Sequence, residues 1–174
     1  MEPIRRGDTI GVGSLHGLAW IGGRCLMTVT RVDIIDRSVE KAHIWINDLA
    51  EDLGTDNKHY AYRVLRAFLH ALRDHLSVDE AAALGAQLPI FVRGVFYEGW
   101  NPSRTPVHAR DLDGFLRRIA VEARLAGETE ASFAAAAANR VLDRHISAGE
   151  AQSVLNALPP HLRELLRENA AANQ

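Results

Sequence analysis

The stretch LRDHLSVDEAAALGAQLPIFVRGVFYEGW, residues 72–100, decides the fold, because a divergent copy returns as LDRHISAGEAQSVLNALPPHLRELLREN at residues 142–169. A unit of this length that occurs twice indicates an internal duplication, since a solenoid needs at least three units to bury its faces. At an offset of seventy residues the copies share the pairs Leu72 and Leu142, His75 and His145, Ser77 and Ser147, Glu80 and Glu150, Leu88 and Leu158, Pro89 and Pro159, and Arg93 and Arg163.

Each copy predicts a helix, a tight corner and a second helix. Ser77 and Glu80 have the spacing of a reciprocal N-terminal cap, in which each side chain accepts a hydrogen bond from the backbone N–H of the other residue. Ser147 and Glu150 repeat that spacing. A proline follows about two and a half turns later in both copies and suits a helix start, where its missing N–H costs nothing.

Apolar residues also recur every three or four positions upstream of each copy, which predicts two further helices in each half. Those of the first half begin near Ser38 and Asp56, and those of the second half near Leu112 and Thr129. The predicted fold class is therefore all-α and internally duplicated, with two four-helix halves packed around a shared core.

The N-terminal part differs in composition from the rest of the chain. Six of the thirteen glycines lie in the first 25 residues, and no helical or alternating period fits there. We predict a tail without regular structure over residues 1–30, with translation starting at either Met1 or Met27, and an extended lead-in from Met27 to Ile35. The remaining predicted parts are the first helical repeat at 31–100, the linker at 101–109 and the second helical repeat at 110–169.

Composition and charge restrict the function classes. The 174 residues are 47% apolar and 24% charged, the balance of a soluble globular protein. A net charge of −2 favours neither nucleic acid nor an anionic membrane as a partner. The single cysteine, Cys25, cannot form an internal disulfide, so a reducing cytoplasm is the expected location.

One asymmetry between the halves concerns side-chain size on the second helix of each. The first half has bulky residues where the second half has alanines: Val64, Leu65 and Phe68 correspond to Ala134, Ala135 and Ala138. Either another helix approaches the alanines closely or a shallow groove remains there. Close approach is the favoured expectation, because protein interiors leave few voids.

Several motifs resemble a known family. They are Leu72-Arg73-Asp74-His75-Leu76, Ala86-Gln87-Leu88-Pro89 and Arg93-Gly94-Val95-Phe96-Tyr97-Glu98-Gly99-Trp100, with Trp45 and the corner Gly54-Thr55-Asp56. From about Arg31 to about Leu166 the chain resembles domain of unknown function 2267, an uncharacterised, mostly bacterial family. The resemblance implies a small all-helical protein, in some members internally duplicated, and no activity. The tail lies outside the family pattern, and the second copy keeps only Arg163 of the Arg-Gly…Gly-Trp segment.

The paired histidines His75 and His145 are candidate metal ligands. If the halves bring them together, two imidazoles and a carboxylate such as Asp74 would suit a metal ion. The structural alternative is favoured, because a histidine in the last turn of a helix interacts well with the terminal carbonyls.

A second candidate is a ligand site at Arg93, Tyr97, Glu98 and Trp100. The guanidinium of Arg93 suits a carboxylate or phosphate, and the other three residues form an aromatic and acidic rim found in the first half alone. The structural alternative has Arg93 and its counterpart tie each corner together through Glu80 or Glu150, and it is again favoured.

No residues suggest catalysis, because Ser77 and Ser147 serve as caps and no serine lies in a nucleophile elbow. No cofactor is predicted. The leading hypothesis is a cytoplasmic, non-enzymatic binding or protein-interaction module, with a protein, a small molecule or a second copy as partner. The alternative is a small-molecule or metal-binding protein, including an enzyme, that uses the two candidate sites. A third hypothesis, DNA binding, rests on a basic face formed by Lys58, Arg63, Arg66 and Arg73.

Overall fold

The computed structural model describes residues 18–21, 24–27, 32–107 and 111–171. The chain forms two compact units, residues 1–36 and 37–174. In the first unit, strands β1 (Leu18–Ile21) and β2 (Arg24–Met27) form an antiparallel hairpin. The hairpin contradicts the prediction that residues 1–30 have no regular structure. The rest of that predicted tail lies outside the described residues.

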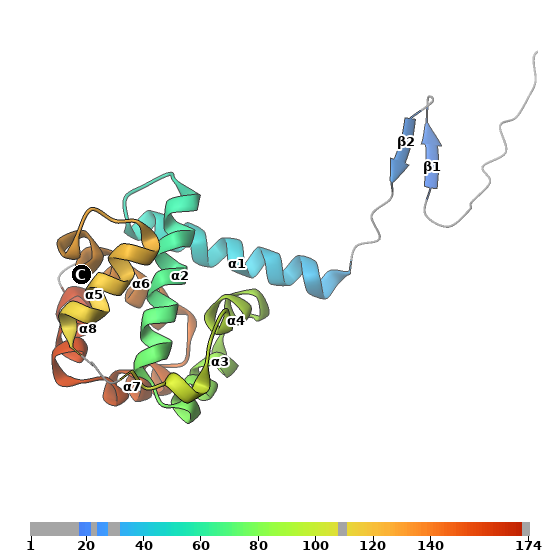
Figure 1. Cartoon of the computed structure of the whole chain (residues 1–174). Coiled ribbons are helices and arrows are strands. Elements are labelled where there is room, and N and C mark those ends of the chain that lie inside the picture. The colour runs from blue at the N-terminus through green and yellow to red at the C-terminus, as the bar shows by residue number, and fades with distance from the viewer. Residues whose placement is uncertain (1–17, 22–23, 28–31, 108–110, 172–174) are drawn as a thin grey trace, which may run out of the picture. The chain divides into compact units, whose positions relative to one another are not determined.

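The second unit is built from α-helices joined by short corners (Figure 1). Apart from the hairpin and a short 3-10 turn at Pro102–Arg104, each regular element in the described residues is an α-helix, so the all-α class is confirmed for this body. No helix in the described ranges combines the length and apolar character needed to cross a membrane. The helices are α1 (Asp33–Asp52), α2 (Lys58–His75), α3 (Val78–Gln87), α4 (Ile90–Tyr97), α5 (Leu112–Ala123), α6 (Glu128–His145), α7 (Ala148–Ala157) and α8 (Pro160–Ala171).

The repeated corners form as the sequence predicts. The hydroxyl of Ser77 accepts from the Glu80 N–H at 3.3 Å, and the Glu80 carboxylate accepts from the Ser77 N–H at 2.7 Å. The Ser147 hydroxyl accepts from the Glu150 N–H at 3.3 Å in the same way. The bounds of α2 and α6, and of α3 and α7, are offset by seventy residues at both ends.

Two predicted helix starts are wrong by a few residues. α1 begins at Asp33 rather than near Ser38, because the Val32 carbonyl accepts from the N–H groups of Ile35 and Asp36, three and four positions further on. The carboxylate of Asp33 suits the positive end of the helix. Residues 33–35 are therefore helical and not an extended lead-in. α2 is capped by Asn57, whose side chain accepts from the Tyr60 N–H at 3.0 Å, and not by Asp56.

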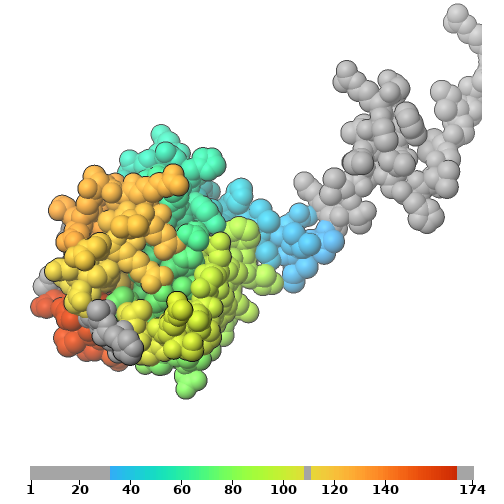
Figure 2. All heavy atoms as spheres, in the orientation of Figure 1, coloured from blue at the N-terminus to red at the C-terminus, as the bar shows by residue number. Residues whose placement is uncertain are grey.

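Helix α2 runs through the middle of the helical body, with α5 and α6 on one side and α3 and α4 on the other (Figure 1). The space-filling view shows α5, in yellow, against the green segments of the first half (Figure 2). α5 packs on both α2 and α6, while α8 packs along α6. The buried apolar side chains of both halves form one continuous cluster, which agrees with the predicted shared core.

The first helix of each half packs against the second helix of the other half. The ring of Trp45 on α1 stacks on His145 of α6, with 4.8 Å between centroids. Phe115 on α5 meets His75 of α2 edge-on at 5.2 Å. Residues 45 and 115 correspond at the repeat offset, as do residues 75 and 145. The two sets of four helices are therefore intertwined rather than set side by side.

The alanines of α6 mark close helix packing. Ala134, Ala135 and Ala138 are completely buried, and α6 contacts α2, α5, α7 and α8. Alanine has no side chain beyond Cβ, so neighbouring helices approach the α6 backbone directly. The favoured expectation at these three positions is confirmed.

Candidate functional site

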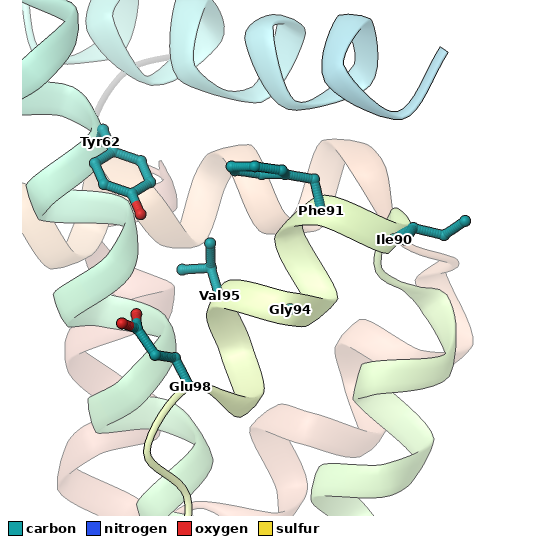
Figure 3. Close-up of a pocket in the computed structure, with 6 residues that line it drawn as sticks. All are labelled: Tyr62, Ile90, Phe91, Gly94, Val95 and Glu98. Atoms are coloured by element: carbon teal, nitrogen blue, oxygen red, sulfur yellow. The ribbon is translucent and has the colours of Figure 1, made fainter. Parts of the chain in front are cut away.

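Three neighbouring hollows between α1, α2 and α4 share Tyr62 as a lining residue, and together they are called the groove below. The largest hollow, about 430 Å³, is the one drawn in Figure 3, and the one at the opposite end is about 260 Å³. The third hollow is small, about 10 Å³, and shares lining residues with both of the others. Its lining includes Ile46, Leu65, Phe91, Val92 and Val95. The groove residues used below are Ile46, Lys58, Tyr62, Ile90, Phe91, Gly94, Val95 and Glu98.

Large apolar side chains remain open to solvent along this groove. Tyr62 on α2 and Phe91 on α4 extend toward each other, with Val95 between them (Figure 3). Phe91 is 45% exposed and Ile90 is 60% exposed. Exposed apolar clusters of this kind mark binding surfaces more often than isolated exposed residues do.

Gly94 leaves one wall of the groove without a side chain. A Cβ placed on Gly94 would meet no atom within 4 Å, so the space beside it is open. Helix α4 buries only Val92 and Phe96 of its eight residues. The helix therefore presents most of its surface to the groove and to solvent.

Polar side chains of α2 hold α4 in place by its C-terminal end. His70 Nε2 lies 2.8 Å from the Val95 carbonyl oxygen. Arg73 Nη1 donates to the carbonyl oxygens of Phe96 and Glu98 at 2.6 and 3.0 Å. Donors at the last carbonyls satisfy groups that a helix end leaves unpaired, and cationic donors also complement the helix dipole. The position of α4 thus depends on polar contacts as well as on its two buried side chains.

The same residues connect α4 to α5 through Glu122. Glu122 accepts from Arg66, and its Oε1 lies 2.7 Å from His70 Nδ1. Burial alone would raise the pKa of Glu122, but His70, Arg66 and Arg118 outweigh it and hold the pKa below the usual value. Arg66 Nε also donates to Glu98 at 2.8 Å, and this bond lowers the pKa of Glu98. Arg66 is therefore shared by two carboxylates at one end of the groove.

Arg93, the centre of the predicted ligand site, has a structural role. Its Nη2 donates to the carbonyl oxygens of Ala86 and Leu88, both at 3.0 Å, at the end of α3. Arg163 makes the matching bonds at the end of α7, to Asn156 at 2.9 Å and Leu158 at 3.1 Å. The expected structural role of each arginine agrees with these bonds, but the predicted partners Glu80 and Glu150 are wrong, because the acceptors are backbone carbonyls.

The other members of that predicted site do not converge with Arg93 on a cavity. The Tyr97 hydroxyl donates to the Ala81 carbonyl at 3.2 Å and lies against Gly85, where a Cβ would overlap it. The Tyr97 ring stacks on Trp100 with 5.2 Å between centroids. Of the four predicted ligand residues, Glu98 alone lines the hollow in Figure 3.

The two predicted metal ligands have separate partners. His75 Nδ1 lies 2.7 Å from the Ala71 carbonyl oxygen, and His145 Nε2 lies 2.6 Å from Asp48 Oδ2. Asp74, the proposed third ligand, instead forms ion pairs with Arg73 and Arg118 at 2.7 and 2.6 Å. Within the described ranges, no group of three or more histidine, cysteine, aspartate or glutamate side chains is arranged to hold a metal.

Sequence reasoning missed Tyr62, Phe91, Gly94 and Val95 as site residues. One signal was present: α4 carries Ile90, Phe91 and Val92 in succession, and successive residues cannot all face one core. At least one large apolar residue at the start of that helix therefore had to face away from the core.

These features define a small protein with an all-helical body that carries a groove between α1, α2 and α4. The model of the family described as Uncharacterized conserved protein (DUF2267) matches residues 42–165, and the chain belongs to this family. The match includes the groove residues named above, all of the stretch 72–100 and residues 142–165 of the similar second stretch. Among curated proteins, none matches the chain.

Proposed function

We propose that the chain is a non-enzymatic protein-interaction module and that the groove between α1, α2 and α4 binds an apolar segment of a partner protein. The observation that supports this proposal is the open row formed by Tyr62, Phe91 and Val95, with Ile90 exposed at its end. Burial of apolar area contributes about 25 cal/mol per Å². Aromatic side chains in such grooves commonly carry most of the binding energy.

We also infer that the two halves arose by duplication and that, among the described residues, the first half kept a groove where the second carries smaller side chains. The matched helix bounds, the matched arginine bonds and the reciprocal ring contacts support this inference. At the repeat offset, Tyr62 corresponds to Ser132, a much smaller residue, and Gly94 corresponds to Glu164. α8 packs more extensively along α6 than α4 does along α2.

The small-molecule alternative has no comparable support. Arg93 donates to the carbonyls at the end of α3, and Tyr97 is bonded and stacked within its own half. Neither side chain lines a hollow together with Glu98. A soluble ligand would therefore find these groups already engaged.

The test places a photo-crosslinking amino acid at position 94 or at position 149, in the cells from which the gene derives. Gly94 and Gly149 are both helical glycines with open space at Cβ, but Gly149 lies on α7, away from the groove. We expect a discrete protein adduct from position 94 and none from position 149. Equal labelling from both positions, or no adduct at position 94, would contradict the proposal.

A further inference from the structure

His70 on α2 lies between two hydrogen-bond acceptors that belong to two different helices. Its Nδ1 is 2.7 Å from Oε1 of Glu122 on α5, and its Nε2 is 2.8 Å from the carbonyl oxygen of Val95 on α4. Both distances are those of hydrogen bonds. His70 is 4% exposed, so both contacts are sheltered from solvent. One side chain therefore connects α2 to both of these neighbouring helices.

Neither partner of the ring has a proton to donate. A backbone carbonyl is an acceptor only. Oε1 of Glu122 also accepts from Arg66, and the pKa of Glu122 lies below its usual value, so this carboxylate is ionised at neutral pH. A neutral imidazole has one N–H donor, whereas an imidazolium has two. Both contacts are hydrogen bonds only when each ring nitrogen carries a proton.

We infer that His70 is a pH-sensitive switch: with both nitrogens protonated it holds α4 and α5 against α2, and loss of one proton as the pH rises releases α4. The release falls on α4 because the ionised carboxylate is the stronger acceptor and keeps the proton on Nδ1. Nε2 then turns a lone pair toward the Val95 carbonyl oxygen, and that hydrogen bond is lost. α4 is one wall of the groove, but the inference does not depend on which partner the groove binds.

The matching position in the second half holds a permanent cation. At the repeat offset His70 corresponds to Arg140, and Glu122 corresponds to Asp52. Arg140 Nε lies 3.3 Å from Asp52 Oδ2, so both α2 and α6 place a nitrogen donor against a carboxylate from the first helix of the other half. Arginine stays charged at physiological pH, whereas histidine titrates in that range. The same contact is thus permanent in the second half and titratable in the half that carries the groove.

Charged groups around the ring come from α2, α4 and α5. A carboxylate favours the protonated ring, whereas a guanidinium opposes it. In the described residues these groups are Glu122 and Arg118 on α5, Glu98 on α4, and Arg66, Arg73 and Asp74 on α2. Arg73 donates to the carbonyl oxygens of Phe96 and Glu98, and these bonds do not depend on the His70 proton. The end of α4 therefore stays attached to α2, and the release is confined to the turn around Val95.

NMR of the full-length protein with ¹⁵N-labelled histidine tests the inference, because the ring signals distinguish a protonated nitrogen from a bare one. Spectra are recorded from about pH 5 upward until the ring loses a proton or the protein unfolds. Amide hydrogen exchange in α4 is measured at the same pH values, as protection factors that remove the intrinsic effect of pH. His70→Gln abolishes the titration, and His59→Gln is the matched control, an exposed histidine on the same helix.

We expect both nitrogens of the His70 ring to be protonated at the lower pH values and Nδ1 alone to keep its proton at the higher ones. The Glu98 amide donates to the same Val95 carbonyl at 3.2 Å, so its protection should fall about threefold to tenfold in that step, as the loss of one hydrogen bond implies. His59→Gln should show the same step, and His70→Gln should show none.

The wild-type ring signals test the inference even if His70→Gln does not fold. A ring with a single protonated nitrogen at every pH at which the protein is folded would overturn it, as would a ring that keeps both protons until the protein unfolds. A remaining proton on Nε2 instead of Nδ1 would contradict the release of α4. So would unchanged protection of the Glu98 amide, or a fall in protection that persists in a folded His70→Gln variant.

Discussion

The two sets of four helices, α1 to α4 and α5 to α8, differ in how their last helix meets their second helix. In the first half, α4 meets an α2 that carries Tyr62, Leu65 and Phe68, and an open groove remains beside Tyr62. In the second half, α8 packs along an α6 whose matching side chains are small: Ser132, Ala135 and Ala138. We propose that the bulk of these α2 side chains, absent from α6, keeps the groove beside Tyr62 open.

The largest expected effect removes bulk from the first half. Phe68 is completely buried and meets Phe115 edge-on at 6.4 Å between centroids. We expect Phe68→Ala to lower the free energy of unfolding by about 3–5 kcal/mol, since it leaves a cavity where its counterpart already has alanine. Urea unfolding followed by circular dichroism measures the loss. A loss of unfolding free energy below about 1 kcal/mol would contradict this expectation. It would show that the helices around position 68 move together and fill the cavity.

The reverse change adds bulk to the second half. Ala135 is completely buried and corresponds to Leu65. We expect Ala135→Leu to destabilise the protein by about 1–3 kcal/mol, because a tightly packed site must move apart to hold the larger side chain. The same unfolding assay applies. An unchanged stability would mean that α6 has unfilled space, contrary to its close packing.

Acid should weaken the packing of α5 on α2 through Glu122. Its pKa is lowered in the folded state, so its contribution to stability is present above its unfolded pKa, near 4.5, and is lost as pH falls through the lower folded value. We expect the melting temperature of the wild type to fall below about pH 5, and Glu122→Gln to flatten part of that fall. Melting curves at a series of pH values measure it. An identical pH profile for the variant would contradict this account of the contact.

The smallest expected effect is a gain in stability at the groove. Gly94 is a helical glycine with open space at Cβ, so Gly94→Ala should stabilise α4 by about 0.5–1 kcal/mol. Gly149→Ala on α7 is the matched control and should give a similar gain. A loss of stability in Gly94→Ala alone would show that the wall of the groove is closed at that position.

Local structure was largely predictable from the sequence. Ser77 and Glu80, the repeated prolines and the seventy-residue offset indicated the corners and helices correctly, because caps and apolar periods depend on neighbouring residues. The close packing of α6 followed from Ala135 and the neighbouring alanines. The predicted start of α1 was wrong because its first hydrogen bonds are accepted by the backbone carbonyl of Val32. Every residue type has such a carbonyl, so no sequence pattern marks it.

Contacts between elements were harder to predict. Trp45 of α1 stacks on His145 of α6, so the first helix of one half contacts the second helix of the other half. This contact depends on the angle between the halves, and no residue spacing in the sequence determines that angle. The acceptors of Arg93 are backbone carbonyls, and any residue type supplies a carbonyl. The groove was missed for a similar reason: it depends on how far Tyr62 and its neighbours hold α4 from α2. A resemblance to a family does not give the distance between α4 and α2.

We propose that, within the described residues, the groove beside Tyr62 has no open counterpart along α6, and the most direct test is a methyl NMR titration with benzyl alcohol as an apolar probe. Val95 lines the groove, and its counterpart Leu165 lies on α8. The account predicts saturable shifts of the methyl signals of Val95 and Ile46, and none for Leu165. Equal shifts in the two halves, or no shift at Val95, would contradict it.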